Sequence, residues 1–194
     1  FPEFERRSID TLRQPLEDRV VSIARVHSSA LFPADFILIA AMNPTRGSDD
    51  GGEYASQMLE TYKQKISGPI LDRIDLWLPV PRVNYETLTS VNTQEGETER
   101  AREQVQKARE RQKERFRGRG IVSNAEMSAR TIDELIPLSA SVRELLKQSA
   151  TKLRLSPRSY HRVIKVARTI ADLDDKDEIG EMHVLEALQY RVKM

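Results

Sequence analysis

Residues 36–44 read Phe-Ile-Leu-Ile-Ala-Ala-Met-Asn-Pro, an unbroken apolar run of strand length that stops at the side-chain amide of Asn43. Such a run is typical of a strand buried on both faces of a parallel sheet. Ligands of open α/β sheets bind at the carboxyl ends of the strands. The run therefore predicts an α/β fold in which the sheet presents Asn43 at its ligand-binding edge.

A second motif follows at residues 67–76, Ser-Gly-Pro-Ile-Leu-Asp-Arg-Ile-Asp-Leu. It places Arg73 between a short helix and a further apolar strand predicted for residues 74–80. A cation at such a corner can project from the domain. An amide and an arginine in these positions suit a nucleotide phosphate.

Working outward from these motifs, hydrophobic periodicity predicts two dissimilar parts. The first part, residues 1–80, is predicted to hold a helix at 3–18 and a hairpin with strands at 20–26 and 30–32. Sheet strands are predicted at 36–42 and 74–80, and another helix at 53–65. Residues 81–96 are polar and predict a connector. The second part, residues 97–194, is predicted to be helical at 97–117, 128–136, 139–153, 156–173 and 180–191, and its last four helices to form a bundle.

Bulk composition limits the class of protein. The chain has 194 residues, a formal net charge of +1 and no cysteine. Contact with nucleic acid must therefore come from local clusters of charge. The three histidines, His27, His161 and His183, lack the spacing of metal ligands, so no metal site is predicted. The sequence has no signal peptide and no apolar run of membrane-spanning length, which predicts a cytoplasmic protein with no membrane partner.

Several blocks, in one order along the chain, carry a family resemblance. They are Phe1–Phe4, Leu12–Asp18, Ala40–Pro44, Ser67–Asp75, Ala167–Leu173 and Glu186–Arg191. Together they resemble the magnesium-chelatase-type AAA+ ATPases, and within them the bacterial ComM/YifB branch. The resemblance covers essentially the whole chain. It implies the carboxyl-terminal part of an AAA+ P-loop core, with a partial parallel sheet, followed by a helical lid.

The sequence contains no GxxxxGK[ST] phosphate loop. In the resembled family, Pro-Glu-Phe lies just after the acidic Walker B pair, so Pro2–Phe4 indicates a fragment that begins after both Walker motifs. The resemblance implies ATP and Mg²⁺ as cofactors of the intact protein. We expect neither to bind tightly to this fragment, and we expect the isolated fragment to be inactive.

The resemblance implies catalytic roles for two residues. Asn43 matches sensor 1, an amide that positions the attacking water or contacts the γ-phosphate; the alternative is a turn former before Pro44. Arg73 matches the arginine finger, which reaches the nucleotide of a neighbouring subunit. The alternative for Arg73 is a salt bridge to Asp72 or Asp75.

Nucleotide-binding cations are predicted in the helix at 156–173. Arg158, Arg162 and Lys165 recur at helical spacing and share one face. That face fits the family's sensor 2, a lid cation that contacts the γ-phosphate. The sequence does not choose among the three, although comparison with the chelatase relatives points to Lys165. The alternative is a solvated basic face.

A basic helix begins the second part of the chain. Between Arg100 and Arg119 it carries nine lysines or arginines and three acids. Contact with a phosphate backbone is one interpretation. A solvated, self-paired face is the more common meaning of such a pattern.

The leading hypothesis is the sensor-and-lid portion of an AAA+ ATPase that assembles as a homo-oligomeric, hexameric ring and handles DNA in recombination or transformation. One alternative is the motor subunit of a metal chelatase, which would remodel a partner that inserts magnesium into a porphyrin. Another is a non-catalytic helical adaptor that binds nucleic acid through its basic helix.

Overall fold

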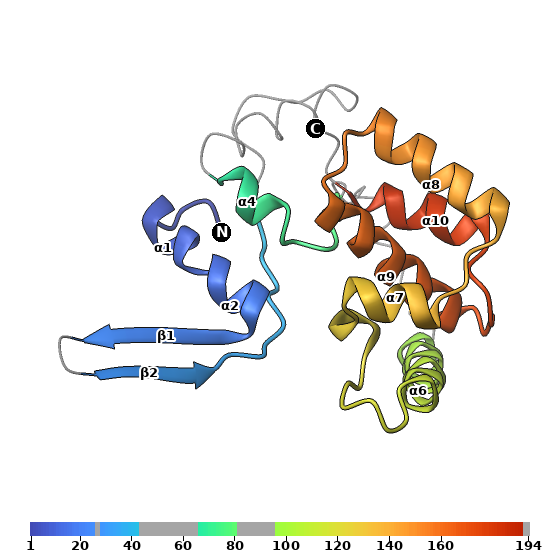
Figure 1. The fold of residues 1–194 in the computed structure, drawn as a ribbon, viewed down its shortest axis with the longest axis horizontal. Coiled ribbons are helices and arrows are strands. Elements are labelled where there is room, and N and C mark those ends of the chain that lie inside the picture. The colour runs from blue at the N-terminus through green and yellow to red at the C-terminus, as the bar shows by residue number, and fades with distance from the viewer. Residues whose placement is uncertain (26–27, 43–65, 81–95, 192–194) are drawn as a thin grey trace, which may run out of the picture. The chain divides into compact units, whose positions relative to one another are not determined.

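The chain folds as two compact units in the computed structural model, which describes residues 1–25, 28–42, 66–80 and 96–191. Unit 1 is Phe1–Ile74 and unit 2 is Asp75–Met194. Figure 1 shows a hairpin and short helices in unit 1, and longer helices in unit 2. Each unit is considered by itself.

Unit 1 opens with two short helices, α1 (Arg6–Thr11) and α2 (Arg13–Asp18), where the sequence predicts one helix over 3–18. The break falls at Leu12, whose N–H donates to the Ile9 carbonyl at 3.1 Å, a bond three residues back that tightens the turn. Arg19 then ends α2 with a left-handed backbone, φ 56°. The helical region is confirmed, but as two segments.

The hairpin predicted after these helices is confirmed. Strand β1 (Val20–Arg25) pairs antiparallel with β2 (Ser28–Pro33), in a register that runs from Val20 opposite Pro33 to Arg25 opposite Ser28. Most of the hairpin is exposed, including the apolar side chains of Leu31 and Phe32.

The buried strand predicted at 36–42 is wrong. Residues 36–42 form no strand, and the side chains of Ile37 and Ile39 are 83% and 90% exposed. Residues 74–80 likewise form no strand, although they were predicted to. A strand is stabilised only when a neighbouring strand takes its backbone hydrogen bonds. In the described part of the chain the only sheet is β1–β2, so the predicted parallel sheet is not formed there.

The buried apolar side chains of unit 1 gather around α4 (Gly68–Leu71), the short helix of the second motif. Among the described residues of unit 1 they are Ile9, Ile66, Ile70 and Leu71. The helix is preceded by Ser67, and Pro69 lies in its first turn, where a missing backbone N–H costs no helical hydrogen bond.

Unit 2 is helical, as predicted. It contains α6 (Glu97–Arg115), the 3₁₀ turn η1 (Asn124–Glu126), α7 (Ala129–Leu135), α8 (Ala140–Lys152), α9 (Pro157–Leu173) and α10 (Glu181–Gln189). Ser128, Ser139 and Ser156 accept a hydrogen bond from the backbone N–H three residues later, which stabilises the first turns of α7, α8 and α9.

Helix α9 is the centre of unit 2. It packs against α6, η1, α7 and α10. Its apolar face carries Val163, Ile164 and Ala167, all at most 2% exposed. The other buried apolar side chains of this core are Phe116, Met127, Ile132, Ile136, Val142, Leu146, Ile170, Ile179, Val184 and Ala187. Each large one contributes about 1.5–3 kcal/mol by leaving water.

None of the helices in the described ranges combines the length and the apolar character that a membrane crossing requires.

Candidate functional site

Asn43, the predicted sensor 1, lies outside the described residues, so the structure neither supports nor opposes its role.

Arg73, the predicted arginine finger, is held within unit 1. Its Nε donates to the Arg13 carbonyl at 3.1 Å and its Nη1 to the Pro69 carbonyl at 2.6 Å. Its Nη2 forms an ion pair with Glu17 at 2.8 Å, and the side chain is 13% exposed. The salt-bridge alternative named Asp72 or Asp75, whereas the partner found here is Glu17 of α2.

Ser67, the first residue of the same motif, is buried and links α4 to α1. Its hydroxyl donates to Oδ1 of Asp10 at 2.7 Å and accepts from Nη2 of Arg13 at 3.0 Å. Arg13 also pairs with Asp10 at 2.8 Å. The Ser67 hydrogen bond and the Arg13 charge hold the pKa of Asp10 below its ordinary value. The motif is thus tied to the start of the chain by side-chain contacts on both Ser67 and Arg73.

The three predicted lid cations lie along α9 in different surroundings. Arg158 is exposed near the first turn of the helix. Arg162 forms an ion pair with Asp75, and its side chain is 16% exposed. Lys165 donates from Nζ to the Ala125 carbonyl at 3.0 Å. The three cations thus share one face of α9, and Arg162 and Lys165 contact other parts of unit 2.

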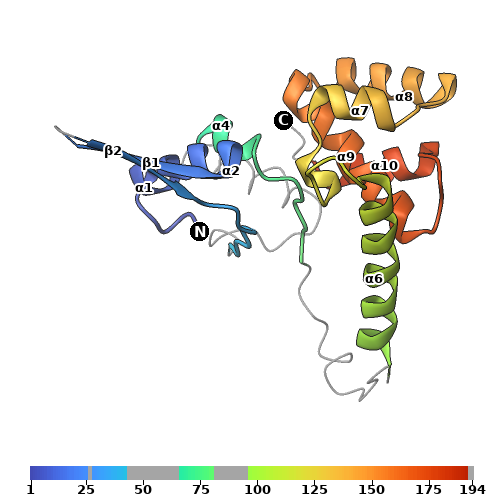
Figure 2. The same cartoon turned by 60° about the horizontal axis from the view of Figure 1, so that its bottom comes forward.

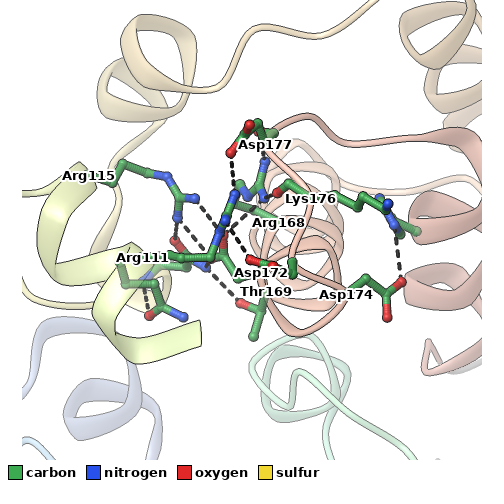
Figure 3. Close-up of polar contacts among 12 residues, drawn as sticks. Arg111, Arg115, Arg168, Thr169, Asp172, Asp174, Lys176 and Asp177 are labelled. Carbon is green, nitrogen blue, oxygen red and sulfur yellow. Dashed lines mark hydrogen bonds and ion pairs between the residues drawn. The ribbon is translucent and has the colours of Figure 1, made fainter. Parts of the chain in front are cut away.

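A buried ionic cluster on the same helix was not predicted. Asp172 has a fully buried side chain, toward which three arginines point (Figure 3). Arg115 of α6 donates to this carboxylate from both Nη atoms, with Nη1 at 2.9 Å from Oδ2. Arg168, one turn earlier on α9, donates to Oδ1 at 3.0 Å, and Asn124 of η1 donates to Oδ2 at 2.8 Å.

These contacts change the pKa of the Asp172 carboxyl group. Burial by itself raises the pKa of a carboxyl group, but the hydrogen bonds from Arg115 and Asn124 and the charge of Arg168 outweigh it. The pKa of Asp172 therefore lies below its ordinary value. Burial also lowers the pKa of Arg168, against the opposing effect of Asp172.

Arg111 extends the cluster to the loop after α9. It forms ion pairs with Asp175, at 2.7 Å, and with Asp177. Arg168 donates to the backbone carbonyls of Lys176 and Asp177 in the same loop. The cluster thus joins α6, η1, α9 and the loop after α9, and it fixes the carboxyl-terminal half of α6 against the bundle.

Part of this cluster had a visible signal in the sequence. Arg168 and Asp172 are four residues apart and fall among Ile164, Ala167 and Ala171 on the apolar face of α9. Opposite charges at that spacing on a buried face indicate an internal ion pair. The contribution of Arg115 had no such signal, because it depends on how α6 crosses α9.

Across the described ranges, no group of three or more histidine or acidic side chains is placed to hold a metal ion.

Comparison with protein families decides the class of this chain. Residues 95–191 match the family described as magnesium chelatase, subunit ChlI C-terminal, and residues 1–88 match magnesium chelatase, subunit ChlI. The chain belongs to the magnesium chelatase subunit ChlI family. This ChlI-family membership confirms the resemblance drawn from the sequence blocks.

Named relatives of this ChlI-family chain lie in the branch expected from the sequence. The chain is similar to competence protein ComM of Haemophilus influenzae, with 39% identity over 98% of this chain and 37% of the relative. It is also similar to uncharacterised YifB proteins of Salmonella typhimurium, with 36% identity, and Escherichia coli, with 35% identity. Those two alignments cover 98% of this chain and 38% of each relative. The chain thus spans well under half the length of these relatives.

Proposed function

We propose that this chain is the sensor-and-lid portion of an AAA+ ATPase that couples ATP binding and hydrolysis to remodelling, with DNA handling as its task. The observation that carries this proposal is the 39% identity to competence protein ComM across 98% of the chain. The helical second part, with a row of cations along its central helix, supports the lid assignment.

In the proposed intact protein, subunits form a homo-oligomeric ring, hexameric by family resemblance, and each site holds ATP with Mg²⁺. Asn43 positions the attacking water, because an amide can both donate and accept hydrogen bonds without adding charge near phosphate. Arg73 supplies positive charge to the γ-phosphate of the neighbouring subunit.

Arg73 must change partners to act in this way. Its guanidinium would exchange the Glu17 carboxylate and the two backbone carbonyls of Arg13 and Pro69 for phosphate oxygens. Such an exchange is chemically reasonable, because phosphate and carboxylate both accept paired N–H bonds from a guanidinium. Glu17 then competes with the neighbouring nucleotide for Arg73.

Among the lid cations we assign sensor 2 to Arg158. Its exposure supports this choice, since a cation that meets a nucleotide must reach solvent. Arg162, which pairs with Asp75, and Lys165, which donates to the Ala125 carbonyl, remain the other candidates. Arginine can also bind phosphate through two parallel hydrogen bonds, which lysine cannot.

The lid assignment is tested by ATP turnover of the intact protein. Arg158→Ala should lower kcat by roughly 10²-fold, the cost typical of removing one charge-stabilising donor. Arg143→Ala, which removes an exposed arginine from α8, is the matched control and should leave kcat unchanged. Wild-type turnover in each of Arg158→Ala, Arg162→Ala and Lys165→Ala would show that no lid cation senses the nucleotide.

The motor subunit of a metal chelatase is the second candidate, and the description of the matched family favours it. The two candidates differ in what stimulates ATP hydrolysis by the intact protein. Stimulation by DNA supports the DNA-handling proposal. If a porphyrin-binding partner stimulates ATP hydrolysis and DNA does not, the chelatase alternative is supported.

A further inference from the structure

Helix α6 packs on the rest of unit 2 through only part of its length. Its buried side chains are Ala108 and Gln112, and every residue from Glu97 to Lys107 is exposed. Figure 2 shows the amino-terminal half of α6 extending away from the other helices of unit 2. This half, therefore, has no packing partner among the described residues.

The structure divides the nine cations between Arg100 and Arg119 into two groups. Four of them form ion pairs within unit 2: Arg111 with Asp175 and Asp177, Arg115 with Asp172, Arg117 with Glu114, and Arg119 with Glu134. The other five are Arg100, Arg102, Lys107, Arg109 and Lys113, all exposed and without an ion pair to any residue that the structure describes.

Three of these five cations lie on one face of the helix. Arg102, Arg109 and Lys113 are spaced seven and four residues apart, which keeps them within about 40° of one another around the helix axis. We name these three residues the α6 basic stripe. Along the axis its members are separated by roughly 10.5 Å and 6 Å. The stripe lies about 100° from the face that carries Ala108 and Gln112.

Four of the five acids of α6 lie to one side of this stripe. Glu99, Glu103, Glu110 and Glu114 share a neighbouring face. Glu110 accepts a hydrogen bond from Gln106, and Glu114 pairs with Arg117. Charge on α6 is thus separated into an acidic strip and a basic stripe, so a polyanion aligned with the stripe avoids the acids.

The carboxyl-terminal end of the stripe opens onto a hollow. Lys113 lines it together with Glu110, Glu114, Arg117 and the turn at 118–122. Gly118 and Gly120 have φ of 75° and 72°, and a Cβ added to either would meet no atom within 4 Å. Lys113, the last cation of the stripe, therefore borders a hollow whose lining also includes Glu110 and Glu114 of the acidic strip.

From these observations we propose that the α6 basic stripe binds the phosphate backbone of DNA without reading its sequence. A row of exposed arginine and lysine side chains along a helix is complementary to a polymer that carries one charge about every 3.4 Å along each strand. No base-reading geometry is involved, because the contacts are those of charge alone. The inference deepens the DNA-handling function proposed above and rests on it.

The test is fluorescence anisotropy of a labelled DNA duplex titrated with residues 1–194 over a series of KCl concentrations. The variant carries Arg102→Gln, Arg109→Gln and Lys113→Gln. Loss of each phosphate contact should weaken binding by roughly tenfold at 0.1 M salt and reduce the slope of log K against log salt by about 0.9. Circular dichroism checks that the variant keeps its helices.

The matched control removes three charges from α8 through Arg143→Gln, Lys147→Gln and Lys152→Gln. It should bind DNA as the wild type does. Three results would each overturn the proposal. The two triple variants could weaken DNA binding equally, or the wild-type chain could fail to bind DNA. The wild-type chain could also bind polyglutamic acid, labelled in the same way, as tightly as it binds DNA.

A further variant tests the acidic strip. Glu103→Gln with Glu110→Gln should tighten DNA binding, since it removes repulsion beside the stripe. Unchanged or weaker binding would count against the proposal. Basal ATP turnover of the intact protein should be unchanged by the stripe variant, so failure of DNA binding can be told apart from failure of the ATPase proposal.

Discussion

Asp172 is the residue on which the internal electrostatics of unit 2 depend. Its carboxylate is fully buried and is contacted by Arg115, Arg168 and Asn124. A buried charge is tolerated only when it is paired, and removal of one partner leaves the other uncompensated. Asp172 therefore holds two arginines in the interior of unit 2.

Asp172→Asn should destabilise the chain by about 3–5 kcal/mol, because the side chain keeps its shape but leaves the arginine charges uncompensated. Urea denaturation at pH 7 measures the change. The control is Asp133→Asn on the exposed face of α7, which should cost less than about 0.5 kcal/mol. Equal effects of the two substitutions would contradict the role given to Asp172.

The pH dependence of that stability follows from the direction of the Asp172 shift. Its pKa is lowered on folding, so the unfolded chain binds more protons and stability rises with pH in this range. The contribution of Asp172 is full above its unfolded pKa of about 3.9 and is lost as the pH falls through its folded pKa. The difference between wild type and Asp172→Asn should narrow below about pH 4.

At the residue level, the sequence can predict only the relations between side chains that are close in the chain. The cationic face of α9 could be predicted from helical spacing alone. The engagement of Arg73 with Glu17 could not, because these residues are far apart in the sequence and meet only when α2 and α4 pack. The same limit applies to Arg115, which reaches Asp172 from another helix.

At the level of elements, side-chain hydrogen bonds stabilise the starts of three helices. Ser139 caps α8, since its hydroxyl accepts from the Val142 N–H at 3.3 Å. Ser128 and Ser156 do the same for α7 and α9. Each cap satisfies a backbone donor that the helix itself cannot satisfy.

Ser139→Ala should therefore lower the free energy of unfolding by about 1 kcal/mol, whereas Ser139→Asp should restore most of it because aspartate is also a good cap. Thermal unfolding followed by circular dichroism distinguishes the three proteins. Identical melting temperatures for wild type and Ser139→Ala would show that the hydroxyl does not stabilise α8.

Helices were predicted better than strands for a physical reason. A helix makes its backbone hydrogen bonds within one segment, so its range can be predicted from periodicity and caps, as for α6 to α10. A strand depends on a neighbour. The hairpin has its neighbour close in sequence and was predicted correctly. Residues 36–42 have the composition of a buried strand, but in the described structure no strand pairs with them.

At the scale of the whole molecule, the described residues of the two units form cores of different size. Unit 2 has a continuous apolar core around α9, and unit 1 has a small cluster around α4. The proposed function needs residues from both units: Asn43 and Arg73 from the first, and a lid cation from the second. It also needs more than one copy of the protein, because an arginine finger acts on a neighbour's nucleotide.

ATP turnover by mixed subunits tests this central claim most directly. Asn43→Ala and Arg73→Ala subunits of the intact protein should each be inactive alone. Mixed rings should regain turnover, because some sites combine the sensor of an Arg73→Ala subunit with the finger of an Asn43→Ala subunit. If rings form but mixing restores no turnover, the shared nucleotide site is contradicted. Arg73 would then act only within its own subunit, which its contact with Glu17 would explain.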